Sequence, residues 1–301
     1  MGDNLPLFTV VISTYNRKHV LPRAISSVLG QTCGDFELIV IDNGSTDGTE
    51  AAVSAIKDPR IKYIRNPEPT SSCDGPRNMG IEMAKGSYIA FLDDDDIWYP
   101  QRLEKVKEAF DSDPGVSAVC HNENRNYKGK VDKVLEYGPW SDDIYERLLY
   151  DGNCLSSCAT TVKKGVFDRL GGFDLRQEYA AAADYDFWLR MTGNGAKVCF
   201  IKEPLGEFGY TGKNWSSADP AFQSRIAALI RDHIVNHENK PVSGISDKGM
   251  LRLIKLYIIA SKSFLSAFRI TDALKYLMMA SQLTVKRPHL IVKLPSGGGR
   301  K

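Results

Sequence analysis

The stretch YIAFLDDDDIWYP, residues 88–100, places an apolar run directly before four consecutive aspartates, Asp93 to Asp96. The run YIAFL is typical of a buried parallel strand. Neighbouring carboxylates repel one another, by roughly 4 kcal/mol for a pair at about 4 Å and an effective dielectric of about 20. The strand before them and Trp98 after them restrict how far these charges can move apart. The pattern therefore indicates a positively charged partner at the end of this strand.

Apolar strands and amphipathic helices alternate on the N-terminal side of this stretch. Thr46 or Asp47 is expected to cap the second helix, and Pro76 to be the first residue of the third. The alternation predicts an α/β fold with a doubly wound, mainly parallel sheet. Ligands bind beyond the carboxyl ends of such strands, so STYNR, DNGSTD and DDDD are expected on one edge. The predicted strands are 7–13, 36–42, 60–66 and 87–93, and the helices 17–32, 48–58 and 75–86.

The pattern continues more weakly on the C-terminal side. It predicts helices over 101–114 and 184–195, strands over 115–123 and 196–210, and a hairpin or loop over 127–140. Three amphipathic helices without intervening strands follow residue 217. We therefore expect a main domain over 1–217, a small C-terminal helical region over 218–290 and a flexible tail over 291–301.

Composition narrows the class of protein. The 301 residues include 39 basic and 37 acidic side chains, a net charge of +2, which argues against a nucleic-acid partner. No apolar run reaches the roughly 18 residues that a membrane-spanning helix needs. The scattered cysteines and the absence of a secretory leader predict reduced thiols in a cytoplasmic protein. Basic residues in the last helices leave open a peripheral contact at the inner face of the cell membrane, and the same helices could instead form a homodimer.

Three charged features are candidates for ligand binding or catalysis: the four aspartates, Asp42 and Arg77. Carboxylates at a strand end suit Mg²⁺ or Mn²⁺ shared with substrate phosphates, and the alternative is a solvated acidic turn. Asp42 follows the second strand, where it could accept hydrogen bonds from a ribose or a base, or merely start the turn. Arg77 lies at a helix start and could bind a phosphate, although an ordinary surface arginine has the same pattern.

A later segment, DYDFWLR, carries two further aspartates on a predicted helix. Asp186 and Arg190 are spaced to form a pair four residues apart, which gives Asp186 a structural role. Asp184 is then left either to act in catalysis or to cap the helix. The spacing does not favour one role over the other.

Five segments, taken in order, resemble glycosyltransferase family 2, which has the GT-A fold. They are VVISTYNRKHVLPRAISSVLGQT, FELIVIDNGSTDGT, RNMGIEMAKGSYIAFLDDDDIW, LGGFD and DYDFWLR, and the match covers roughly residues 7 to 217. The resemblance implies transfer of a sugar from a nucleotide-diphosphate donor, a divalent metal (Mn²⁺ or Mg²⁺) and inversion at the anomeric carbon. UDP-sugars are the favoured donors, and cell-surface polysaccharide or glycoconjugate assembly is the favoured setting. The acceptor hydroxyl could belong to a glycan, a lipid-linked sugar or another molecule.

The resemblance also implies roles for individual residues. Asp95 would be the metal ligand, and Asp184 the catalytic base that takes a proton from the acceptor hydroxyl. The metal and Arg77 would stabilise the charge that builds on the leaving diphosphate. The residues expected to bind the sugar nucleotide are Thr14, Tyr15, Arg17, Asp42, Arg77, Asp93 and Asp94.

Two departures from the family pattern leave room for another function. Ala183 stands where the family often has a glutamate, and Tyr210 and Thr211 stand near the place, at the end of the domain, where many members have a histidine. The alternative is therefore a non-catalytic protein that binds sugar nucleotides or acts as a scaffold. Other enzyme classes fit less well, because DDDD is not followed by the Gly-Thr of aspartyl-phosphate phosphatases and no GxxxxGK[ST] loop is present.

Overall fold

The computed structural model describes residues 5–210 and 219–293, which form two compact units. The second unit takes in two segments from the middle of the chain besides the C-terminal helices. These segments bond to the first of those helices: the Tyr179 hydroxyl donates to Asp232 at 2.9 Å, and His233 Nε2 lies 2.9 Å from Asp186. The first unit comprises 5–144, 154–175 and 190–210, and the second comprises 145–153, 176–189 and 219–293.

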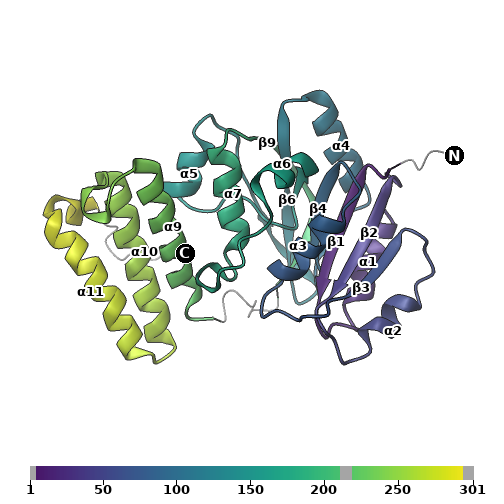
Figure 1. Cartoon of the computed structure of the whole chain (residues 1–301), viewed down its shortest axis with the longest axis horizontal. Helices are drawn as coiled ribbons and strands as arrows, with labels where there is room; N and C mark the ends of the chain where they lie inside the picture. The colour runs from purple at the N-terminus through teal and green to yellow at the C-terminus, as the bar shows by residue number, and fades with distance from the viewer. Residues whose placement is uncertain (1–4, 211–218, 294–301) are drawn as a thin grey trace. The chain divides into compact units, whose positions relative to one another are not determined.

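A mixed sheet of nine strands forms the centre of the first unit among the described residues (Figure 1). Its order is β3-β2-β1-β4-β8-β6-β9-β5, and β7 pairs with β6. The strands from β3 to β4 are parallel, as are β6 and β9, whereas β8 runs antiparallel to β4 and β6. The strands are β1 Phe8–Thr14, β2 Phe36–Asp42, β3 Ile61–Arg65, β4 Tyr88–Asp93, β5 Ile97–Trp98, β6 Val116–Tyr127, β7 Lys130–Leu135, β8 Thr160–Lys163 and β9 Lys197–Tyr210.

Helices cover both faces of the parallel strands, which confirms the predicted doubly wound α/β fold. Alternate residues of β1 show why: Val10 and Ile12 join the core beneath α1 and α4, whereas Val11 lies against α3. A strand buried on both faces is rich in apolar residues, as the run from Val10 to Ile12 in β1 is. The helices of this unit are α1 Leu21–Leu29, α2 Thr49–Ser54, α3 Asp74–Met83, α4 Arg102–Ser112 and α6 Lys164–Leu170.

Two predicted helix starts differ from the structure. Helix α3 begins at Asp74, so Pro76 is its third residue and not its first; Cys73 is already near-helical, and its carbonyl accepts the N–H of Arg77. Gly48, with φ of 93°, precedes α2 as its N-cap residue. The Asp47 carboxylate accepts the N–H of Thr49 at 3.0 Å, so it binds the first turn of the helix without being its N-cap.

The second unit contains the three predicted C-terminal helices: α9 Phe222–Glu238, α10 Asp247–Ser266 and α11 Ile270–Lys286. Helix α10 contacts both α9 and α11 and lies between them in Figure 1. Ser246 caps α10 by accepting the N–H of Gly249 at 3.1 Å. None of the described helices combines the length and apolar character needed to cross a bilayer. Two further helices are α5 Ile144–Tyr150 and α7 Ala183–Gly193.

The contact of α3 with β1 depends on a glycine, which gives a test of the packing. A Cβ on Gly80 would lie 2.4 Å from Cγ1 of Val11, in a buried contact. We expect Gly80→Ala to lower the free energy of unfolding by about 1–3 kcal/mol through overpacking. Gly165→Ala on α6 is the control, because a Cβ there meets no atom within 4 Å and should be neutral or stabilising. Equal denaturant midpoints for both variants would contradict this account of the packing.

Candidate functional site

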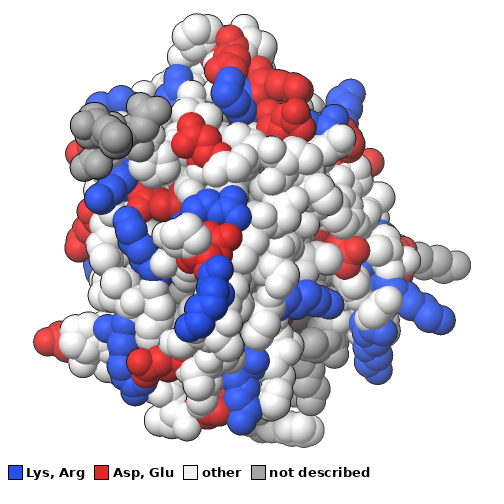
Figure 2. Space-filling model, turned by 90° about the vertical axis from the view of Figure 1, so that its right-hand side faces the viewer, with Lys and Arg blue, Asp and Glu red and all other residues white. Residues whose placement is uncertain are grey.

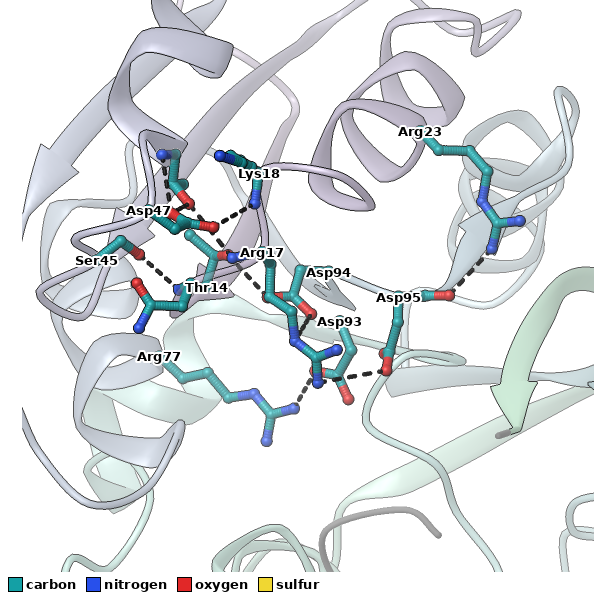
Figure 3. A network of polar contacts seen from close by, with 12 residues as sticks. Thr14, Arg17, Lys18, Arg23, Ser45, Asp47, Arg77, Asp93, Asp94 and Asp95 are labelled. Atoms are coloured by element: carbon teal, nitrogen blue, oxygen red, sulfur yellow. Dashed lines mark hydrogen bonds and ion pairs between the residues drawn. The ribbon is translucent and has the colours of Figure 1, made fainter. Parts of the chain in front are cut away.

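The four aspartates lie at the end of β4 and in the link to β5, and each has a different environment. Figure 3 shows Asp93, Asp94 and Asp95. Asp93 ends β4 and contacts Nη2 of Arg77, which comes from α3. Arg77 also lies 3.6 Å from Asp74 and is buried, so it is not an ordinary surface arginine. The first carboxylate therefore has a fixed cationic partner inside the protein.

Asp94 and Asp95 face the loop that follows β1. The Thr14 hydroxyl donates to Asp94 at 2.8 Å, and the Arg17 guanidinium lies 3.7 Å from Asp94 and 4.0 Å from Asp95. Burial raises the pKa of Asp94 to about 7 despite the Thr14 hydrogen bond. Burial and the charge of Asp93 also raise the pKa of Asp95. Arg17 is half exposed and is thus available to a ligand at the same time.

The side chain of Asp96 points into the interior of the protein and not toward solvent. Its Oδ1 accepts the N–H of Gly209 in β9 at 2.7 Å, and its Oδ2 is buried without a hydrogen-bond partner among the described residues. Burial, and then the charge of Asp93, hold the pKa of Asp96 well above its usual range. Gly209 is required here, because a Cβ would lie 2.5 Å from the Asp95 carbonyl oxygen. The sequence alone did not distinguish Asp96 from its neighbours.

The loops after β1 and β2 meet beside this link, on one edge of the sheet as predicted. The parallel register explains this, because it pairs Thr14 with Asp42 and Ser13 with Asp93. Asp42 is fully buried and accepts from the Ser45 N–H at 2.8 Å and from the Tyr63 hydroxyl. These bonds show that Asp42 organises its own loop, as the turn interpretation expected. Its role toward a nucleotide stays a prediction.

Hydrogen bonds hold together the loops that follow β1 and β2. Asn16, in the left-handed region with φ of 54°, donates its N–H to Ser45 Oγ at 2.7 Å. Its side-chain oxygen accepts the Thr46 N–H at 2.8 Å. Tyr15 and Arg17, on either side of Asn16, remain exposed. A rigid backbone thus presents two large side chains at the edge where the aspartates lie.

The carboxylates have the right chemistry for a hard divalent ion. The ligand atoms of Asp93, Asp96 and Cys158 lie within 4.8 Å of one another, so this group could hold a metal. Asp96 and Cys158 are buried, however, and a thiol is a poor ligand for Mg²⁺ or Mn²⁺. The side chains of Asp93 and Asp95 are 38% and 35% exposed and offer oxygens toward solvent. Asp95 as the metal ligand stays a prediction.

A buried polar layer lies behind the aspartates, and sequence reasoning missed it. The Arg102 guanidinium stacks 3.7 Å from the Trp98 ring, and its Nε lies 3.3 Å from Nε2 of His121. Burial lowers the pKa of Arg102 to about 9 and that of His121 to about 3, so His121 is neutral. Glu123 accepts the Tyr137 hydroxyl at 2.8 Å, and burial raises its pKa to about 7. Strand-like patterning over 115–123 gave no sign that its polar residues were buried.

Asp184 lies in the second unit, in the first turn of α7, and its Oδ1 accepts the N–H of Tyr185 at 2.7 Å. Ala183, at the position where the family often has glutamate, is buried. Ala181 has φ of 66°, a left-handed conformation that costs a non-glycine residue roughly 1–2 kcal/mol. Asp186 lies 2.9 Å from Nε2 of His233, a partner other than the Arg190 that the spacing predicted. Arg190 donates to the carbonyls of Leu170 and Gly172. The other departure from the family pattern, the missing histidine, concerns the region of Tyr210 and Thr211. Thr211 lies outside the described residues.

Charge is intermixed on the face of the molecule in Figure 2. Blue and red side chains alternate there, and no broad basic patch appears among the coloured residues. This view agrees with the near balance of charges in the sequence.

Known proteins share both the sequence pattern and the fold. The model of glycosyl transferase family 2 matches residues 9–171. The UDP-Glc:alpha-D-GlcNAc-diphosphoundecaprenol beta-1,3-glucosyltransferase WfaP of Escherichia coli is 30% identical over 194 residues, 64% of this chain and 73% of that protein.

Two solved structures support the same fold. Staphylococcus aureus TarS 1-349 in complex with UDP-GlcNAc has a TM-score of 0.65 at 16% identity, with 91% of each chain covered. The mannosyltransferase PcManGT of Pyrobaculum calidifontis, in complex with GDP-Man and Mn²⁺, has a TM-score of 0.58 at 17% identity and covers 96% of this chain and 84% of its own.

The family match covers more than half of the chain, over the segment that carries the four aspartates, Asp42 and Arg77. The doubly wound sheet followed by C-terminal helices is the GT-A fold that the sequence predicted. The protein is therefore a glycosyltransferase that belongs to glycosyl transferase family 2.

Proposed function

We propose that this enzyme transfers a sugar, with inversion, from a UDP-sugar to an acceptor hydroxyl in the assembly of a cell-surface polysaccharide or glycoconjugate. The observation that carries the proposal is the aspartate link at the carboxyl edge of the sheet, with Arg17 and Arg77 beside it. Partly exposed carboxylates next to cationic side chains suit a metal–diphosphate ligand, because the ion neutralises the carboxylates and the arginines bind phosphate oxygens.

Asp95, with support from Asp93, is the proposed holder of Mn²⁺ or Mg²⁺. Such an ion supplies positive charge to the leaving diphosphate. Arg17 is half exposed and can turn toward phosphate oxygens, whereas the buried Arg77 is fixed by Asp93 and Asp74. Asp42 and Tyr15 border the proposed place of the uridine. The Mn²⁺ complex of PcManGT and the UDP-GlcNAc complex of TarS support this kind of ligand.

Asp184 is the proposed general base. A carboxylate can accept the proton of the acceptor hydroxyl as that oxygen attacks the anomeric carbon. The first turn of α7 suits this role, because it presents the side chain on a rigid element and the helix dipole stabilises its charge. Because Ala183 stands where the family often has a glutamate, Asp184 lacks that acidic neighbour and would accept the proton of the acceptor hydroxyl alone.

A lipid-linked sugar is the proposed acceptor. WfaP, by its name, acts on a sugar attached to diphosphoundecaprenol. A cytoplasmic enzyme would meet such an acceptor at the inner face of the membrane.

One prediction from the proposed function concerns the metal. We expect UDP to bind more tightly with Mn²⁺ than without it, and Asp95→Asn to weaken the metal-dependent binding by about tenfold or more, because one anionic oxygen ligand is lost. Titration calorimetry of UDP, GDP and dTDP, each with and without Mn²⁺, measures this. Asp111→Asn, an exposed change on α4, is the matched control and should bind as the wild type does. Metal-independent binding of UDP would remove the metal from the mechanism, and tighter binding of GDP or dTDP would change the donor.

Another prediction from the proposed function concerns the base. We expect Asp184→Asn to lower kcat by about 10²- to 10⁴-fold, the usual range for a general base, with UDP affinity unchanged. Transfer to a lipid-linked acceptor and UDP binding are measured on the same preparation. Asp168→Asn, an exposed substitution on α6, is the control. A variant that keeps its activity would assign the base to another residue, and a wild type that binds UDP without transferring sugar would favour the scaffold function.

A further inference from the structure

Helix α11 exposes a continuous apolar stripe. Five large apolar side chains of this helix are each more than half exposed, and their spacing of 4, 7, 8 and 15 residues from the first places them on one face. The opposite side of the helix is buried through Ala273, Ala280 and Leu283, in the unit where α11 packs on α10 (Figure 1). The exposed stripe is therefore a second apolar face that the helix pair does not use. It comprises Ile270, Leu274, Leu277, Met278 and Val285.

The turn between α10 and α11 adds a ring to this surface. Phe268 is 90% exposed and has φ of 60°, a left-handed conformation that favours glycine. The N–H of Arg269 donates to the Phe264 carbonyl at 2.9 Å, and that of Phe268 to Leu265 at 3.0 Å, so the turn is tightly closed. A position that suits glycine thus holds a large aromatic side chain that packs against almost nothing.

Positive charge accompanies the apolar stripe. Residues 251–293 contain eight Lys or Arg and a single acidic residue, Asp272, whereas the whole chain is nearly neutral. Asp272 is itself paired with Arg269 at 2.7 Å. Lys262, Lys275 and Lys286 are exposed, and the last two lie on α11 next to the stripe in sequence. An apolar face with lysines at its border is typical of a helix that lies in a membrane interface.

We propose that the α10–α11 hairpin docks on a bilayer that contains anionic lipid. The stripe and Phe268 enter the interface between headgroups and acyl chains, and the exposed lysines contact headgroup phosphates. A second copy of the chain fits this surface less well, because an interface formed by the same patch twice would bring like charges together. The inference goes beyond the proposed transfer reaction and does not depend on it.

Flotation of the full chain with vesicles, without any donor or acceptor, tests the proposal. We expect binding to vesicles of phosphatidylcholine and phosphatidylglycerol, and much weaker binding to phosphatidylcholine alone or in high salt. Leu277→Ser/Met278→Ser should weaken binding by about tenfold or more, since two apolar side chains no longer enter the interface. Lys275→Gln/Lys286→Gln should weaken it by roughly tenfold on anionic vesicles, with a shallower salt dependence.

Each variant has a matched control in the first unit. Val131→Ser/Leu175→Ser removes two apolar side chains with the same exposures as Leu277 and Met278, 51% and 58%. Lys130→Gln/Lys133→Gln removes two exposed lysines of β7. Both controls should float as the wild type does.

Phe268→Gly separates binding from folding. Glycine suits the left-handed turn, so this variant should melt no lower than the wild type and yet bind vesicles less tightly. The proposal is overturned if the wild type does not float with anionic vesicles, or if the controls lose as much binding as the stripe variants do. A dimer in sedimentation velocity that the Leu277→Ser/Met278→Ser variant loses, without vesicle binding by the wild type, would assign the surface to a second copy.

Discussion

The structure depends on how four adjacent negative charges are accommodated at the end of β4. A charge removed from water is costly unless it is paired or hydrogen-bonded, and repulsion among neighbours adds to that cost. The link resolves this by sending each carboxylate in a different direction. Asp93 meets Arg77, Asp94 receives the Thr14 hydroxyl, Asp95 remains near solvent beside Arg17, and Asp96 turns inward to Gly209. Strands β4 and β5 hold the backbone on either side of these residues.

The loops around the aspartates are positioned by the carboxyl edge of the sheet. Parallel strands end at one level, so the polar residues after β1, β2 and β4 converge without any long-range signal in the sequence. The hydrogen bonds between Asn16 and the Ser45–Thr46 segment then fix two of the loops to each other. A site held in this way needs little rearrangement when an anionic ligand arrives, which is the condition for electrostatic stabilisation of a developing charge.

Sequence reasoning succeeded where local patterns decide the structure. Strands β1 to β4, the helices between them and the three C-terminal helices follow from apolar periodicity and were predicted with small errors at their ends. It failed where distant segments decide. The two-residue strand β5 and the antiparallel β8 exist because of their partners, and nothing in IW or TTVK requires a strand. The inward turn of Asp96 depends on Gly209 in the same way. The exposure of the apolar stripe on α11 could not be predicted, because apolar periodicity in the sequence is the same whether the face is buried or exposed.

The bond between Asp96 and Gly209 has a consequence for the order of folding. It joins residues 113 positions apart, whereas the strands from β3 to β4 are connected by short crossovers. Closing a long loop costs entropy before any contact is gained, so the local strands are expected to form early and the β5–β9 pairing late. In a chain emerging from the ribosome, the residues of the edge that holds Asp42 and Thr14 are therefore present well before Gly209, the partner of Asp96. The finished arrangement of carboxylates appears only after β9 has emerged.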